Sequence, residues 1–145
     1  MGRRGEEGRA ARRLMAKPRI LAAVRPQGGV AVRRALGEYA EVVPVFGYDE
    51  AVNALRGGTF NLVLCGVFFD ETRALDLLRL VRQEFPGVPF VGCRIGDRAV
   101  SPVMVEAMAI AAKSMGAIAF IDMPLLHADN TTDTDFRSQV LRHIR

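Results

Sequence analysis

Five short apolar runs recur along the chain and predict buried β-strands. Glycine, proline or charged residues bound these runs, which cover residues 19–24, 41–46, 61–67, 88–93 and 117–122. The stretches between them place apolar residues three or four positions apart, the pattern of a helix that buries one face. Helices are therefore expected at residues 29–39, 50–56, 70–85, 102–115 and from about residue 131 to 145.

Several of these helices have residues suited to capping their first turn. Asp49 is expected to cap the second helix, and Ser101, followed by a proline, is expected to open the fourth. The last helix has three candidates for its cap, which are Thr131, Thr132 and Asp133.

Strands that are apolar on both faces and alternate with amphipathic helices are typical of a parallel sheet covered on both sides. Pro44 lies inside the second strand, and its missing N–H would interrupt a central ladder, so this strand is expected at an edge. The pattern therefore predicts an α/β, flavodoxin-like three-layer sandwich. Its five-stranded parallel sheet has the order 2-1-3-4-5, with helices on both faces.

Composition narrows the class of protein. The chain has 145 residues, of which half are apolar and a quarter charged, as expected for one soluble globular domain. No apolar stretch reaches the roughly 18 residues that a membrane span requires. Cys65 and Cys93 both lie in apolar runs, which favours buried thiols in a reducing compartment, so a cytoplasmic location is expected.

The net charge of +4 is concentrated at the N-terminus. Residues 1–18 hold six basic and two acidic side chains, and the remainder is balanced at fourteen of each. This segment has too little apolar surface to offset the entropy of ordering it, so it is expected to be a flexible basic arm. The folded domain is then residues 19–145. A solvated tail is favoured over a nucleic-acid contact, because charge alone is a weak indicator.

Four stretches carry a resemblance to a known family. They read RILAAVRP with the following AVRRAL, YDEAVNALRGGTFNLVLCGV, LDLLRLVRQEFPGVPFVGC, and GAIAFIDMP. Through them, residues 19–145 resemble the receiver domain of bacterial two-component response regulators. The periodicity alone supports the α/β sandwich, and only the resemblance implies a receiver.

Receivers transfer a phosphoryl group to one of their own aspartates, and the resemblance implies where the chemical groups would lie. Acidic ligands for Mg²⁺ would follow the first strand, at Val24 and Arg25. The nucleophilic aspartate would end the third strand, at Gly66. No Asp or Glu occurs in residues 19–37 or 51–69, so a shifted alignment supplies no replacement.

The two remaining receiver positions are also altered. The Thr or Ser that senses the phosphoryl group would fall on Cys93 or Arg94, and the lysine would fall on Met123, with Pro124 retained. Asp70 is expected to cap the following helix rather than to accept phosphate. The resemblance with these departures implies a degenerate pseudo-receiver: no enzyme, no metal and no cofactor.

The residues at these strand ends could instead bind an anion. Arg25 and Arg94 could both face the vacated pocket, and the Gly28-Gly29 turn could present backbone N–H groups to an anionic ligand. We favour the interpretation that both arginine side chains point into solvent.

A function without catalysis requires a surface that binds a partner. The fourth predicted helix is apolar nearly all round, and only one face can pack on the sheet. Six of its residues are expected at an interface, which are Val103, Met104, Ala107, Met108, Ala111 and Met115. Phe68 and Phe69 either fill the vacated pocket or present an apolar tip, with filling favoured.

The sequence thus predicts a phosphorylation-independent signalling or scaffolding module of bacterial origin. Its partners are expected to be proteins, in a homodimer or a larger assembly, without membrane contact. An anion-binding sensor and a nucleic-acid-associated regulator remain the alternatives.

Overall fold

The five apolar runs form one parallel sheet in a computed structural model that describes residues 17–97, 100–125 and 128–144. The strands are β1 (Arg19–Ala23), β2 (Glu41–Val45), β3 (Leu62–Gly66), β4 (Phe90–Gly96) and β5 (Ala119–Pro124). They lie in the order β2-β1-β3-β4-β5, which confirms the predicted topology. Pro44 lies in the edge strand β2, where its missing N–H interrupts no ladder on the open side.

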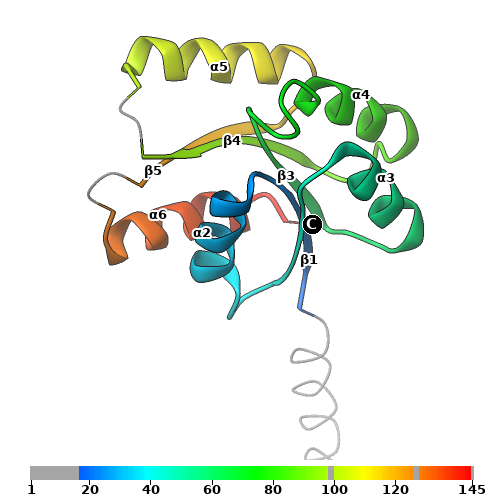
Figure 1. The fold of residues 1–145 in the computed structure, drawn as a ribbon, viewed down its shortest axis with the longest axis horizontal. Helices are drawn as coiled ribbons and strands as arrows, with labels where there is room; N and C mark the ends of the chain where they lie inside the picture. Colours follow the sequence, from blue (N-terminus) through cyan, green and yellow to red (C-terminus); the bar gives the residue numbers. More distant parts are fainter. Residues whose placement is uncertain (1–16, 98–99, 126–127, 145) are drawn as a thin grey trace, which may run out of the picture.

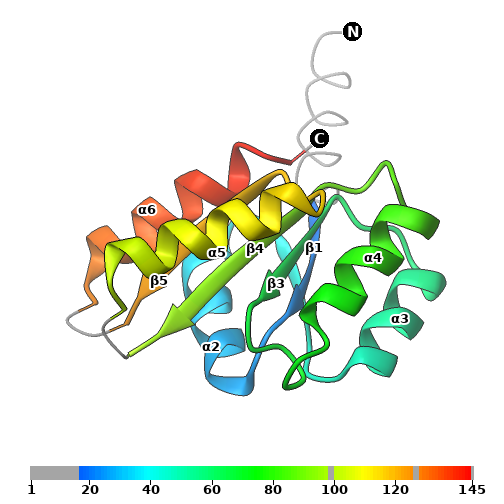
Figure 2. The same cartoon turned by 90° about the horizontal axis from the view of Figure 1, so that it is seen from above.

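Helices cover both faces of this sheet (Figures 1 and 2). On one face lie α2 (Pro26–Leu36) and α6 (Asn130–Leu141). On the other lie α3 (Tyr48–Gly57), α4 (Ala74–Glu84) and α5 (Pro102–Ser114). The flavodoxin-like sandwich is therefore confirmed. None of the helices in the described ranges is long and apolar enough to span a bilayer.

Alternating side chains of the strands supply two separate buried clusters. In β1, Ile20 and Ala22 belong to the cluster on the α2/α6 face, whereas Leu21 and Ala23 belong to the cluster on the α3/α4 face. All four side chains are fully buried. The strand is apolar at every position because both of its faces are covered.

Helices α2 and α4 begin three and four residues away from the positions that the apolar spacing indicated. Helix α2 starts at Pro26 and so includes Gly28 and Gly29 in its first turn. Helix α4 starts at Ala74 because the two residues Asp70 and Glu71 have φ of 44° and 61°, in the left-handed region that a right-handed helix excludes.

The caps also differ in part from the predictions. Ser101 caps α5 as expected, since its Oγ accepts from the backbone N–H of Met104 at 3.2 Å. Asp49, however, lies inside the first turn of α3, after the cap residue Gly47. Helix α6 is capped by Asp129, which the sequence analysis did not name.

Helix α6 begins with a reciprocal capping box, and Thr132 is its second member. The Asp129 carboxylate accepts from the N–H of Thr132, whose hydroxyl accepts from the N–H of Asp129.

The predicted basic arm at residues 1–18 lies almost entirely outside the described residues and stays a prediction.

The two cysteines lie on neighbouring strands but on opposite faces of the sheet. Cys65 belongs to the α3/α4 cluster and Cys93 to the α2/α6 cluster, and the residue paired with Cys93 across the strands is Gly66. Both thiols are free and buried. Burial raises the pKa of Cys93 to about 12 and raises the pKa of Cys65 well above its ordinary value.

We predict that neither thiol reacts with iodoacetamide at pH 8 in the native protein, because each is protonated and inaccessible. Mass spectrometry should show both thiols alkylated after unfolding in guanidinium. Rapid alkylation of either cysteine in the native state would contradict the described burial.

Candidate functional site

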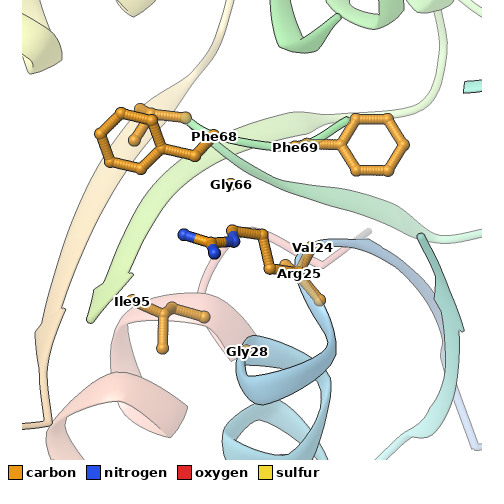
Figure 3. Close-up of a pocket in the computed structure, with 8 residues that line it drawn as sticks. Val24, Arg25, Gly28, Gly66, Phe68, Phe69 and Ile95 are labelled. Atoms are coloured by element: carbon orange, nitrogen blue, oxygen red, sulfur yellow. The ribbon is translucent and has the colours of Figure 1, made fainter. Parts of the chain in front are cut away.

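The carboxyl ends of β1 and β3 border a small cavity at one rim of the sheet (Figure 3). Its volume is about 40 Å³. Pockets for drug-sized ligands measure roughly 300–1,000 Å³, so this cavity admits a water-sized group and no metabolite. The residues that line it are Val24, Arg25, Gly28, Gly66, Val67, Phe68, Phe69 and Ile95.

None of the described residues that line this cavity carries a carboxylate. The residue that ends β3 is Gly66, and the two that follow β1 are the buried Val24 and the exposed Arg25. Divalent Mg²⁺ prefers oxygen ligands, usually including carboxylates, whereas the one charged side chain here is a guanidinium. In the described part of the chain, no group of three or more His, Cys, Asp or Glu is placed to hold a metal ion.

Gly66 is not required by steric crowding. A Cβ atom built there would lie 3.7 Å from Val24 Cγ1 and 3.9 Å from the carbonyl oxygen of Ala23, both ordinary contacts. The backbone of Gly66 is also not among those with positive φ. The strand end therefore has room for a side chain and lacks one.

The two phenylalanines after β3 point in opposite directions (Figure 3). Phe69 is fully buried in the cluster on the α3/α4 face, while the side chain of Phe68 remains 57% exposed beside the cavity. The two predicted roles are therefore divided between them. Phe69 fills the interior and is unavailable to a partner, and Phe68 presents an apolar tip.

The loop that carries these rings is attached to α3. The Asp70 carboxylate accepts a hydrogen bond from the backbone N–H of Tyr48 at 2.8 Å, which satisfies one of the free donors at the start of α3. The guanidinium of Arg73 stacks on the Tyr48 ring at 3.9 Å and forms an ion pair with Asp76. Asp70 thus caps α3, and the prediction that it caps the following helix is wrong.

Comparison with known proteins adds the fold family. No protein-family model matches the chain, and no curated protein matches it. Solved structures do match. A response regulator from Thermotoga maritima superposes with a TM-score of 0.68 at 24% identity, over 88% of this chain and 98% of that one. The chain has the receiver fold.

Two further receiver structures agree. HP1043, an orphan response regulator of H. pylori, matches with a TM-score of 0.66 at 12% identity, over 88% of this chain and 97% of that one. A CheY-like receiver domain protein from Methanospirillum hungatei JF-1 matches with a TM-score of 0.64 at 20% identity, over 86% and 91% of the two chains. Identities this low carry the fold and not the activity.

Met123, where the resemblance would place the phosphoryl-compensating lysine, is a core residue. Its side chain is 1% exposed and lies in the cluster on the α2/α6 face. Its neighbour across the strands is Ile95, which lines the cavity. The sequence analysis did not name Ile95, although it ends the apolar part of β4.

Arg25 and Arg94 do not meet. Arg25 extends its guanidinium toward the cavity (Figure 3). Arg94 is only 5% exposed and pairs with Asp122 of β5, with 2.6 Å between its Nε and the carboxylate. The prediction that both arginines share one pocket is wrong, and so is the alternative that both point into solvent, because Arg94 is buried and neutralised.

The two glycines of the predicted anion turn are part of helix α2. A Cβ at Gly28 would lie 3.2 Å from Val24 Cβ, and one at Gly29 would lie 3.3 Å from the Phe46 ring. Close packing therefore accounts for both glycines. The N–H of Gly29 is already bonded to the carbonyl of Arg25 at 3.0 Å, so it is not free to hold an anion.

Helix α5 presents the apolar surface that the sequence predicted, with one correction. None of its residues is fully buried. Met108 is only half-exposed, because it lies on the side toward the sheet with Val105 and Ala112. The spacing already indicated this, since Met108 is three residues from Val105 and four from Ala112. Ile110 is 63% exposed and also belongs to the outer surface, although it was not among the six residues expected at the interface.

The two phenylalanines provide a matched test of the loop. We predict that Phe69→Ala lowers the free energy of unfolding by about 3–5 kcal/mol, because it removes a fully buried ring. Phe68→Ala should change it by less than about 0.5 kcal/mol, since that ring is mostly in water. Urea denaturation of both variants measures the difference, and equal effects would contradict the assignment of one buried and one exposed ring.

Proposed function

We propose that this receiver-fold protein is an interaction module that works without aspartyl phosphorylation, Mg²⁺ binding or any catalysis of its own. One observation carries the proposal: the rim at the ends of β1 and β3 presents Val24, Arg25 and Gly66 where phosphoryl transfer requires carboxylates. A glycine has no group that can attack a phosphoryl donor. A cationic guanidinium in the same cavity disfavours a divalent metal ion.

The loop geometry supports the same proposal. A receiver that responds to phosphate must bind it differently in two conformations, since a ligand shifts an equilibrium only by its differential affinity. Here the loop after β3 is held by the buried Phe69 ring and by the hydrogen bond between Asp70 and Tyr48. Both interactions are independent of any bound ligand.

Contact with a protein partner then supplies the function, and the outer side of α5 is its best candidate surface. Val103 and Ile110 are 77% and 63% exposed, and Met104 is 51% exposed. Apolar groups gathered on one exposed helix favour association, since burial of such surface is the dominant favourable term in most protein–protein contacts. We propose a second copy of the chain as the partner.

The anion-sensor alternative receives little support. It requires two guanidiniums in one pocket, and Arg94 lies outside the cavity in an ion pair. The cavity is also far smaller than a metabolite. For the nucleic-acid alternative, the relevant arm falls outside the described residues.

Incubation with acetyl phosphate and Mg²⁺, followed by intact mass spectrometry, tests the proposal. We predict no mass increase of one phosphoryl group, with an ordinary receiver domain as the positive control in the same buffer. A phosphorylated species of the wild-type chain would overturn the proposal.

Gly66→Asp is the matched variant within this chain. The position accepts a Cβ atom, which would make only ordinary contacts there. We predict that this variant also remains unmodified, since it restores the nucleophile without restoring the metal ligands at Val24 and Arg25. Efficient phosphorylation of Gly66→Asp would show that the rest of the rim is still competent.

A further inference from the structure

Helix α5 has an unusual distribution of polarity around its axis. The half-buried residues toward the sheet are Val105, Met108, Ala109 and Ala112. The opposite side is exposed, and its central row consists of Val103, Ala107, Ile110 and Ser114. In the figures α5 lies over β4 and β5 with no helix against its outer side (Figures 1 and 2).

The spacing of this outer row is symmetric. Its members are four, three and four residues apart, so the row reads the same from either end. If two copies of α5 cross antiparallel about a two-fold axis, Val103 faces Ser114 of the partner subunit. Ala107 then faces Ile110 of the partner subunit. Each large side chain thus meets a small one, which is the arrangement that packs without voids.

The charges of α5 fit the same arrangement. Glu106 and Lys113 are the only charged residues of the helix, and both are exposed. They lie seven residues apart, so they form one row along the same flank of the outer surface. No ion pair within the described residues involves either of them.

In an antiparallel pair this flank lies against the same flank of the partner. Glu106 is then near Lys113 of the partner subunit, and the two-fold axis repeats the pair, so both charges are matched twice. A parallel pair would instead bring this flank against the row of Met104 and Ala111, which carries no charge. The charge pattern therefore distinguishes the two orientations.

We propose that two copies of the chain associate through an antiparallel pair of α5 helices, matched by the reciprocal Glu106 and Lys113 contacts. This inference rests on the proposed function, because it names the partner and the geometry of the surface assigned there. The helix has 13 residues and is about 20 Å long. Such a pair buries less than the ~1,600 Å² of a standard stable interface, so the dimer should dissociate on dilution.

Charge exchange tests the orientation by sedimentation velocity over a concentration series. Glu106→Lys alone places two positive charges on the row, and Lys113→Glu alone places two negative charges there. Each variant alone should dimerise at least about tenfold more weakly than the wild type, because like charges meet twice. An equimolar mixture of the two should associate as a heterodimer, and the double exchange should restore the homodimer.

Replacement of exposed apolar residues by glutamate provides a second test of the pairing. Ile110→Glu should abolish association, with Val30→Glu as the matched control, because Val30 is a similarly exposed apolar residue, at 67%, on the other side of the sheet. Circular dichroism verifies that each variant is folded.

Cysteine cross-linking measures the register. Two copies of Ala107→Cys should cross-link under mild oxidation, since in this register they are offset by about 4–5 Å along the helix axis. Two copies of Val103→Cys should not, since their offset is about 16 Å. The native cysteines do not interfere, because both are buried.

The outcomes separate the two proposals. A monomer at all concentrations, or a dimer that is indifferent to these substitutions, overturns the helix pairing. Cross-linking at both Val103→Cys and Ala107→Cys also overturns it, since equivalent residues face each other all along a parallel pair. These results do not bear on phosphorylation. Only the acetyl phosphate experiment can contradict the proposed independence from phosphate.

Discussion

Burial of the Phe69 ring is the interaction on which the rest of the rim depends. It draws the loop after β3 into the cluster on the α3/α4 face, and Asp70 follows in a left-handed conformation. This places the Asp70 carboxylate at the start of α3, where it accepts from Tyr48. With the loop closed in this way, a cavity of only about 40 Å³ remains where the resemblance would place a metal and a phosphoryl group.

Under the proposed function, this rim has a structural role only. Among the described residues that line the cavity, Arg25 is the only charged one, and the others are glycine or apolar. The buried Arg94–Asp122 pair joins β4 to β5 under α5. Under the same proposal, any signal that the molecule carries depends on what its outer surface binds, and the exposed row of α5 is the surface that we propose for a second copy of the chain.

Much of this fold was predictable, because it follows from the spacing of the apolar residues and from the glycine, proline and charged residues that bound the apolar runs. The five apolar runs and Pro44 were sufficient for the strand order, and Ser101 was sufficient for the start of α5. The apolar pattern missed the features that depend on tertiary contacts. The left-handed backbone at Asp70 and Glu71 directly follows the buried Phe69, and no local spacing shows it. The sequence likewise offered no sign that Asp122 would neutralise Arg94, since the pair forms only when β4 and β5 lie side by side.

The receiver positions that lack their usual side chains were predictable, whereas the shape of the cavity was less so. The positions of Val24, Gly66 and Met123 followed from the resemblance, whereas the cavity residues Val67 and Ile95 did not. Gly28 and Gly29 suggested a phosphate-binding turn, but close packing against Val24 and Phe46 explains them. A glycine pair before a helix is therefore a weak indicator without a ligand-sized space beside it.

The central claim, that this rim holds neither metal nor phosphoryl group, is tested most directly by nuclear magnetic resonance. Amide spectra would be followed while Mg²⁺ and then beryllofluoride, a phosphoryl analogue, are added to the native protein. Because none of the described residues that line the cavity carries a carboxylate, the resonances of Gly66 and Val67 should remain unchanged at millimolar concentrations of both. Saturable shifts confined to the ends of β1 and β3 would contradict it.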